Sequence, residues 1–296
     1  MQNIKLAIII PFFKIRFFEE TIKSLSNQTN KKFNVYIGND ASNDNPVQLL
    51  KKYNLNNLNY TYFESNLGSK GKLVEQWERC IDLSNDEEWI MILADDDFIS
   101  DNFVETFYKH LEKTEQQKIS LLRFKMRRIS ENSEFLINHL QPRLQKGEDY
   151  VWDDETGKRF ISISENIFTR KIYEKYRFRR YPLAWRTDVM MYLDFSNNNN
   201  VLGINDAFVA VRRSDIQLTR RRDMDNYKLE AQEYFYKDLL LDYGDKFNKS
   251  QKLRFLKYYY FYQNETELDN SITYLFYKYG GLIEFLKFSV KKVLKI

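Results

Sequence analysis

"IKLAIII" (residues 4–10) is an almost continuous apolar run, and its length suits a strand buried on both faces of a parallel sheet. The segments after it alternate between amphipathic helices and short apolar strands. Helices are predicted over 17–25 and 73–83, and strands over 33–37, 60–63 and 89–93. This alternation predicts an α/β fold with an open, mostly parallel sheet and right-handed crossovers.

Beyond Asp97 the pattern is looser. It predicts a helix over 102–114, a strand over 119–129, a polar segment to about residue 160, helices over 166–176 and 185–195, and a strand over 207–213. From about Arg222 the chain is predicted to be helical and is rich in Tyr, Phe, Leu and Lys. We therefore expect two parts, residues 1–215 and a C-terminal helical region over 216–296.

Composition limits the classes of protein that remain. The 296 residues are 43% hydrophobic and 16% aromatic, which predicts a folded globular protein. One cysteine, Cys80, and no basic-then-apolar leader favour a cytoplasmic, reducing location. A single Cys and the isolated His110 and His139 exclude zinc spacing, so any metal is expected to be a hard cation with oxygen ligands.

The net charge of +4 is concentrated in the tail, where residues 276–296 hold five lysines and one acid. The remaining chain is charge-balanced, which disfavours nucleic-acid binding. Residues 282–296 place apolar side chains on one helical face and lysines largely on the other. This pattern is typical of an amphipathic helix lying on anionic lipid, or of a terminal helix packed on its own domain.

Acidic residues follow two of the first strands, at the edge where ligands bind in such sheets. "ADDD" (94–97) places three carboxylates together, and adjacent carboxylates raise one another's pKa unless a cation compensates. A helix-capping role is weakened because Asn102 and Glu105 already form a capping-box pattern. We favour a Mg²⁺ or Mn²⁺ site here over a solvated loop.

Two further acids have both a structural and a functional interpretation. Asp40, in "GNDASND" (38–44), lies at a predicted strand end, where it could accept from a base N–H or form a turn. Asp188, in "WRTDVMMYLDFS" (185–196), could be a first-turn acid favoured by the helix dipole. For Asp188 the residues alone favour that structural role.

Four segments, in this order, resemble the inverting nucleotide-sugar glycosyltransferases of family 2, which have the Rossmann-like GT-A fold. They span roughly residues 4–220 and are "IIIPFFKIRFFEETIKSLSNQTNKKFNVYIGNDASND", "NLGSKG…EQWERCI", "WIMILADDDFIS" and "ISISENIFTRKIYEKYRFRRYPLAWRTDVMMYLDFS". The resemblance implies a nucleotide-binding half over 1–97 and an acceptor-binding half over 98–215. In the first half it implies that Asp40 binds the uracil of UDP and that Pro11 and Phe12 line the nucleoside pocket.

The resemblance also implies a metal site and a catalytic base. Asp96 matches the metal-binding Asp, with Asp95 beside it toward the ribose or metal, and Asp188 matches the general base, which reverses the structural interpretation above. Ala94 stands where many members have the first Asp of Asp-x-Asp, so either Asp95 joins Asp96 or Asp95 and Asp97 form the pair. Asn39 likewise replaces the first Asp of a common Asp-Asp pair.

Basic residues are candidates for binding phosphates, although any one of them alone suits a solvated surface. They are Lys72, Arg212, Arg213, Arg220, Arg221 and Arg222. We expect a metal-dependent inverting enzyme that moves a sugar from a UDP-sugar to a glycan or lipid-linked saccharide in bacterial surface-polysaccharide synthesis, at the inner face of the membrane. A catalytically silent nucleotide- or glycan-binding protein is the alternative, because Asn39 and Ala94 depart from the family pattern.

Overall fold

A computed structural model describes residues 4–55, 57–215, 222–263 and 270–294. Its strands are β1 (Leu6–Phe12), β2 (Phe33–Asn39), β3 (Leu58–Tyr62), β4 (Trp89–Ile92), β5 (Phe98–Ile99), β6 (Leu121–Ile129), β7 (Phe135–His139), β8 (Leu144–Lys146), β9 (Asn166–Thr169) and β10 (Asn200–Arg212). Its α-helices are α1 (Phe18–Ser26), α2 (Val47–Tyr53), α3 (Leu73–Ile81), α4 (Phe103–Gln116), α5 (Gly147–Glu155), α6 (Arg170–Tyr176), α7 (Thr187–Ser196), α8 (Asp225–Tyr243), α9 (Lys249–Tyr262), α10 (Asn270–Leu275) and α11 (Gly281–Leu294).

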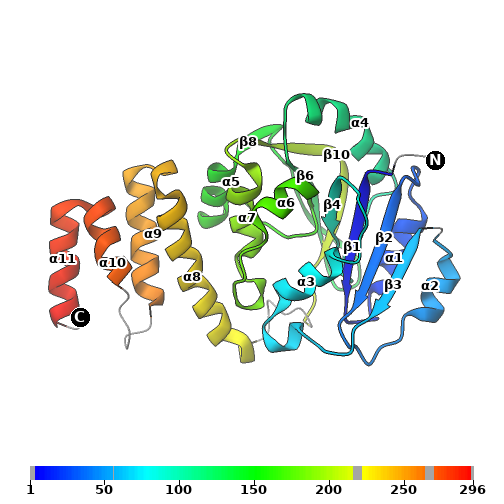
Figure 1. The fold of residues 1–296 in the computed structure, drawn as a ribbon, viewed down its shortest axis with the longest axis horizontal. Coiled ribbons are helices and arrows are strands. Elements are labelled where there is room, and N and C mark those ends of the chain that lie inside the picture. Colours follow the sequence, from blue (N-terminus) through cyan, green and yellow to red (C-terminus); the bar gives the residue numbers. More distant parts are fainter. Residues whose placement is uncertain (1–3, 56, 216–221, 264–269, 295–296) are drawn as a thin grey trace.

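One mixed sheet, with the strand order β3-β2-β1-β4-β9-β6-β10-β5, forms the body of the molecule (Figure 1). Strands β3, β2, β1 and β4 are parallel, as the α/β pattern predicts. Strand β9 is antiparallel to both β4 and β6, and β10 is parallel to β6. The carboxyl ends of β2, β1, β4, β6 and β10 therefore lie along the same edge of the sheet.

Two hydrophobic cores cover the two faces of the sheet, because alternate residues of a strand point to opposite faces. In β1, Ala7 and Ile9 belong to the core that includes α3 and α7, whereas Ile8 and Ile10 belong to the core that includes α1 and α4. Every one of these β1 side chains is fully buried. The expectation that residues 4–10 form a strand buried on both faces is confirmed.

The structure corrects three expectations about the second half. Strand β9 forms where the start of a helix over 166–176 was expected, because Ile167 and Phe168 insert between β4 and β6. The polar segment before residue 160 contains β7, β8 and α5. Strand β10 begins at Asn200 and carries an irregularity between Ile204 and Phe208.

The capping box expected at Asn102 is absent from the start of α4. The Asn102 side chain donates to the Asp206 carbonyl at 3.0 Å, and Glu105 accepts from the Thr29 hydroxyl at 2.7 Å. Both side chains therefore form hydrogen bonds with residues distant in sequence, and not with the helix start as a capping box would require. The three acids that precede this helix do not cap it either, since Asn102 occupies the cap position.

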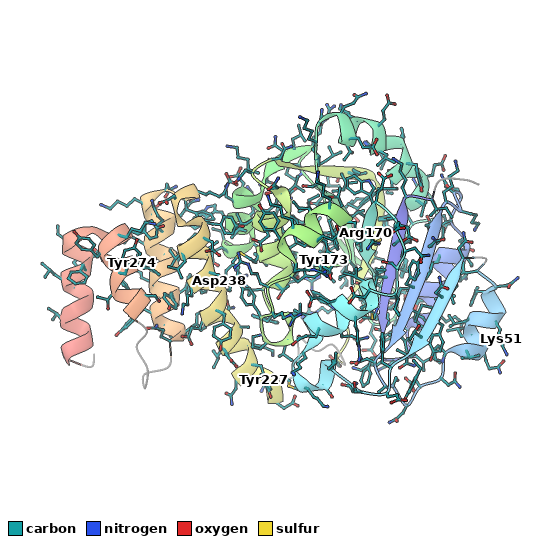
Figure 2. The ribbon with its side chains drawn as sticks, viewed as in Figure 1. Lys51, Arg170, Tyr173, Tyr227, Asp238 and Tyr274 are labelled. Carbon is teal, nitrogen blue, oxygen red and sulfur yellow. The ribbon has the colours of Figure 1, made fainter. Side chains whose placement is uncertain are left out.

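Helices α8 to α11 extend from one end of the sheet domain (Figure 1). The hydrophobic core that includes α3 and α7 continues into α8 and α9 through Phe235, Leu239 and Phe255. On α8, Asp238, labelled in Figure 2, accepts from the Tyr181 hydroxyl at 2.9 Å and lies 3.6 Å from Arg179. The first C-terminal helices therefore share a core with the sheet domain.

Replacing Phe235 by Ala tests this shared core. Phe235 is fully buried and packs against Tyr181 and Tyr236, so we expect Phe235→Ala to lower the free energy of unfolding by about 3–5 kcal/mol. In urea denaturation the single transition should move as a whole. The matched control is Phe261→Ala on α9, where Phe261 is 74% exposed and the change should stay within about 0.5 kcal/mol. A second transition that moves alone would show that the helical region folds independently.

Candidate active site

A cavity of about 920 Å³ opens at the carboxyl edge of the sheet. Its size lies within the range of small-molecule sites. It extends from the loops after β1 and β2, past the acids after β4, to the start of α7. The candidate site residues that line it are Pro11, Asp40, Asp95, Asp96, Asp188, Arg212 and Arg213.

Asp40 forms the floor of one end of this cavity. Its carboxylate accepts from the backbone N–H groups of Leu67 at 2.7 Å and Gly68 at 2.9 Å, and it pairs with Arg79 at 2.6 Å. A Cβ on Gly68 would lie 2.9 Å from the Asp40 carboxylate, so this close approach requires glycine. The sequence analysis assigned no role to Arg79. It lies in the segment "EQWERCI" (75–81), but the family resemblance gives no function to that position.

The end of β1 contributes Pro11 to the cavity and the loop after it contributes Phe13, whereas Phe12 is not among the lining residues. Phe12 is fully buried and packs against Phe18 at a centroid distance of 4.7 Å. Phe13 is 41% exposed. The expected role of the Phe12 side chain in the nucleoside pocket is corrected, because strand alternation turns it into the core.

Asp95 connects the end of β4 to the loop after β1. Its carboxylate accepts from the backbone N–H groups of Phe13 at 2.7 Å and Lys14 at 2.8 Å. Burial, followed by the charge of Asp96, raises the pKa of Asp95 to about 7. A cation beside this pair would relieve the repulsion between the two carboxylates.

Asp97 faces away from the cavity. It is buried, and its carboxylate accepts from the Arg212 backbone N–H at 2.9 Å. Burial and the charge of Asp96 raise the pKa of Asp97 well above its ordinary value. Of the three adjacent acids, Asp95 and Asp96 line the cavity and Asp97 does not.

These acids can serve a cation that also binds substrate. Within the described residues, no group of three or more His, Cys, Asp or Glu side chains is arranged to hold a metal ion by itself. Mg²⁺ is usually held by one or two carboxylates together with substrate phosphates. Asp95 and Asp96, side by side at the cavity wall, provide that kind of donor set.

Arg212, the last residue of β10, lines the cavity and supports the backbone of the acid run. Arg212 is 1% exposed, and its guanidinium donates to the Asp96 carbonyl at 3.0 Å and the Glu131 carbonyl at 2.8 Å. It also pairs with Glu20 at 3.0 Å. These contacts hold the backbone of the acid run.

The other basic candidates are distributed differently. Arg213 is exposed and lines the cavity. Lys72 is exposed at the start of α3 and is not among the cavity-lining residues, and Arg222 is exposed just before α8. Arg220 and Arg221 lie outside the described residues.

Asp188 lies in the first turn of α7 at the other end of the cavity. Burial raises its pKa to about 7, the charges of Asp154 and Glu165 add to the shift, and Arg186 opposes it. The turn that precedes Asp188 contains three non-glycine residues with φ between 52° and 68°, namely Leu183, Ala184 and Arg186. Positive φ at non-glycine residues is costly and persists only where the surroundings enforce it.

Arg186 connects this turn to two helices. It pairs with Asp154 at 2.5 Å and Glu155 at 3.2 Å, both on α5, and its guanidinium lies 4.2 Å from the ring centroid of Phe235 on α8. Glu155 also accepts from the Tyr236 hydroxyl at 2.8 Å. The turn before Asp188 is therefore held from both sides.

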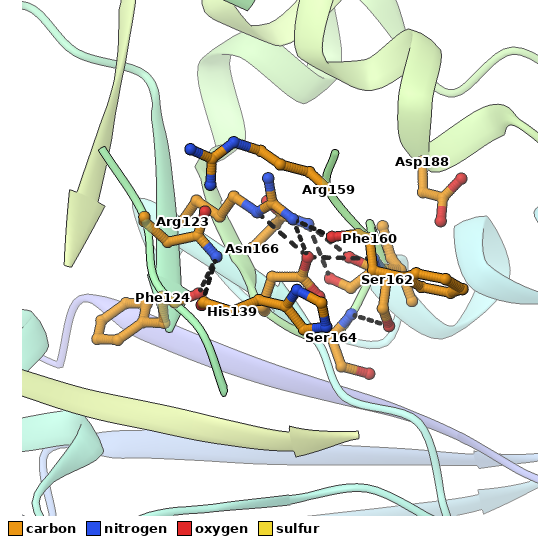
Figure 3. A network of polar contacts seen from close by, with 12 residues as sticks. Arg123, Phe124, His139, Arg159, Phe160, Ser162, Ser164, Asn166 and Asp188 are labelled. Atoms are coloured by element: carbon orange, nitrogen blue, oxygen red, sulfur yellow. Dashed lines mark hydrogen bonds and ion pairs between the residues drawn. The ribbon is translucent and has the colours of Figure 1, made fainter. Parts of the chain in front are cut away.

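A buried network supports the loop over 160–165, which lines the cavity near Asp188 (Figure 3). Arg123 donates to the Phe160 carbonyl and pairs with Glu165 at 2.9 Å. Ser164 accepts from the backbone N–H of Ala94 at 3.1 Å, which connects the loop to the acid run. The sequence analysis did not identify Arg123 or Glu165. The only indications were that Arg123 lies inside a buried strand, β6, and that Glu165 directly precedes another strand, β9.

Comparisons with solved structures show the same fold. The chain matches S. aureus TarS 1-349 in complex with UDP-GlcNAc at 15% identity with a TM-score of 0.66, covering 93% of this chain and 81% of that chain. The complex of TarS 1-349 with UDP matches at 16% identity with a TM-score of 0.62, covering 86% and 70%. GalNAc-T7 with UDP, GalNAc and Mn²⁺ matches at 11% identity with a TM-score of 0.56, covering 88% of this chain but 55% of that one.

A search of curated proteins found no significant match to the sequence. The family model described as Glycosyl transferase family 2 matches residues 7–177, which is more than half of the chain. The matched segment contains β1 to β9 and the acid run, and the structural neighbours have the expected GT-A fold. The chain belongs to glycosyl transferase family 2.

Proposed function

We propose that this glycosyltransferase uses a divalent metal ion to move a sugar from a UDP-sugar to a hydroxyl group of a glycan or lipid-linked saccharide, with inversion at the anomeric carbon. The observation that carries the proposal is that one cavity brings together Asp40, the pair Asp95 and Asp96, and Asp188. Structures of TarS with UDP and UDP-GlcNAc and of GalNAc-T7 with UDP and Mn²⁺ support the choice of donor and metal. Bacterial surface polysaccharide is the proposed product.

At the donor end, the chain's own groups bind and orient the nucleotide. Asp40, which Arg79 and two backbone N–H groups hold in place, would accept from an N–H of the uracil. Asp95 and Asp96 would hold Mn²⁺ or Mg²⁺, which when bound neutralises the charge that develops on the departing diphosphate. The contacts from Phe13, Lys14 and Arg212 keep these two acids in position.

At the acceptor end, Asp188 would act as the general base. Its carboxylate takes the proton of the acceptor hydroxyl as that oxygen attacks the anomeric carbon and UDP leaves from the opposite face. This single displacement inverts the configuration. A pKa of about 7 suits the role, because a general base is most effective when its pKa lies near the working pH.

Asp188→Asn should lower sugar transfer or donor hydrolysis by about 10²–10⁴-fold, because the variant has no base. UDP affinity, measured by calorimetry, should stay unchanged. The unmodified enzyme needs ionised Asp188, so its kcat/KM should rise with pH through about 7 and then level off. The variant should lose this rise.

The matched control is Asp245→Asn, which removes a carboxylate whose side chain is 81% exposed in the helical region. It should leave both turnover and the pH profile unchanged. If the unmodified chain binds UDP but turns over no donor, the chain is the silent nucleotide-binding protein. Equal turnover in both variants would also exclude Asp188 as the base.

Asp96→Ala should weaken UDP binding in the presence of Mn²⁺ by about tenfold or more, and EDTA should do the same to the unmodified chain. Asp97→Asn is the matched control, because Asp97 faces Arg212 and not the cavity. We expect its metal-dependent UDP affinity to equal that of the unmodified chain. An affinity for UDP that neither EDTA nor Asp96→Ala changes would contradict the metal site.

Peripheral contact with a membrane through α11 is part of the proposal. In the part of the chain that the structure describes, no helix is long and apolar enough to cross a membrane. On α11, Ile283, Leu286 and Val290 are 69%, 51% and 54% exposed and follow a helical spacing. The exposed Lys287 and the positive charge of the tail suit an anionic surface.

Ile283→Asp combined with Leu286→Asp should weaken binding to phosphatidylglycerol vesicles by about tenfold or more, because two exposed apolar side chains are lost. Co-sedimentation measures the bound fraction. The matched control is Leu136→Asp combined with Ile137→Asp on β7, where both residues are similarly exposed. Unchanged binding in the α11 variant, or equal loss in both variants, would exclude α11 as the contact.

A further inference from the structure

In the part of the chain that the structure describes, two arginines at the carboxyl edge of the sheet have no acidic partner. Arg128 is at the end of β6 and Arg213 directly follows β10, and both line the cavity. Among the described residues, neither guanidinium forms an ion pair or a side-chain hydrogen bond. The other cavity arginines, Arg186 and Arg212, are both paired with acids.

Arg128 is held in place by an aromatic ring. Its guanidinium lies 4.0 Å from the ring centroid of Phe160, which also lines the cavity and remains 51% exposed. Arg123 donates to the Phe160 carbonyl and so fixes the backbone of that loop (Figure 3). Arg128 is therefore packed on the ring, and no described residue accepts a hydrogen bond from its guanidinium.

The positive charge at this end of the cavity is strong enough to affect its neighbours. Burial and the charge of Arg213 lower the pKa of the Arg128 guanidinium. Burial and the charges of Arg128, Arg123 and Arg159 lower the pKa of His139. An anion placed between Arg128 and Arg213 would relieve this repulsion.

Strand order locates these arginines relative to the proposed donor. Asp40 is at the end of β2, and Asp95 and Asp96 follow β4, with β1 between the two strands. Arg128 is on β6, two strands beyond β4 on the other side, and Arg213 is one strand farther. The acid run leads from β4 into β5, which pairs with β10, and Asp97 accepts from the Arg212 backbone N–H at 2.9 Å. Arg213 therefore follows directly on a residue that contacts the acids, whereas Arg128 packs on Phe160, whose loop lines the cavity near Asp188.

With the base of a nucleotide sugar at Asp40 and its diphosphate at Asp96, the acceptor would enter the rest of the cavity, which Phe160 and Asp188 line. Arg128, packed on Phe160, lies at that end, and Arg213 is its charged neighbour. We propose that Arg128, Arg213 and Phe160 form a subsite for an acceptor saccharide that carries an oxyanion, a phosphate or a carboxylate. The inference rests on the proposed function and adds the chemical class of its acceptor. Guanidinium forks bind either oxyanion through paired hydrogen bonds.

The methyl group of Met126 offers a direct readout, because Met126 lines the same cavity on β6. The chain is labelled with ¹³C-methyl methionine, and Met126→Leu identifies the signal. With UDP and Mg²⁺ saturating, glycerol 1-phosphate and glucuronate are added in separate titrations, and glycerol and glucose serve as uncharged controls at equal ionic strength. We expect saturable shifts of the Met126 signal with the two charged probes only.

Arg128→Gln and Arg213→Gln should each weaken the response to the charged probes by about tenfold or more. Arg128→Lys keeps the positive charge, so this variant should retain part of the response to the charged probes. The matched control is Arg143→Gln, because Arg143 is exposed and does not line the cavity. UDP affinity should be the same in all of these variants.

Four results would overturn the subsite. The first three are an equal response to charged and uncharged probes, an unchanged response in the Arg128 and Arg213 variants, and competition between glycerol 1-phosphate and UDP. Competition would assign the arginines to the donor diphosphate. Normal UDP binding with no response to the charged probes would overturn the acceptor subsite alone, whereas failure of UDP to bind would overturn the proposed function itself.

Discussion

Asp95, Asp96 and Asp97 follow one another at the end of β4, and three carboxylates this close repel one another unless each has its own surroundings. The fold provides them. Backbone N–H groups after β1 bind Asp95, the backbone of β10 binds Asp97, and Asp96 remains at the cavity wall. The three aspartates thus connect β4 to the loop after β1 and to β10 through hydrogen bonds, although these strands are far apart in sequence.

The loop over 160–165 and Arg212 complete this arrangement. Ser164 binds the N–H of Ala94, and Arg212 binds the carbonyl of Asp96, so the backbone on both sides of the acids is fixed. Arg123 and Glu165 support that loop from the core, where burial raises the pKa of Glu165 to about 7. Arg123, Ser164 and Glu165 thus support the charged groups of the site without lining the cavity, whereas Arg212 both supports the acid run and lines the cavity.

Much of the fold and part of the site could be predicted from sequence. Regular periodicity located β1, β2, β4 and α3 to within a few residues, and the strand ends pointed to Asp40 and the acid run. Local patterns failed where long-range contacts decide the structure, as in β9, which looks helical until β4 and β6 flank it. Arg79 and Arg128 were missed because their importance depends on what surrounds them in space, and Asp188 was recognised by resemblance and not by its local pattern.

Arg186 connects the candidate site to the C-terminal region. Its charge is balanced by α5, while its guanidinium faces Phe235 of α8, so the turn that presents Asp188 is built partly on a helix outside the segment matched by the family model. A domain swap that exchanged the helices after residue 222 for those of a relative would therefore change the surroundings of the proposed base. Helix α8 is therefore a structural support of the candidate site.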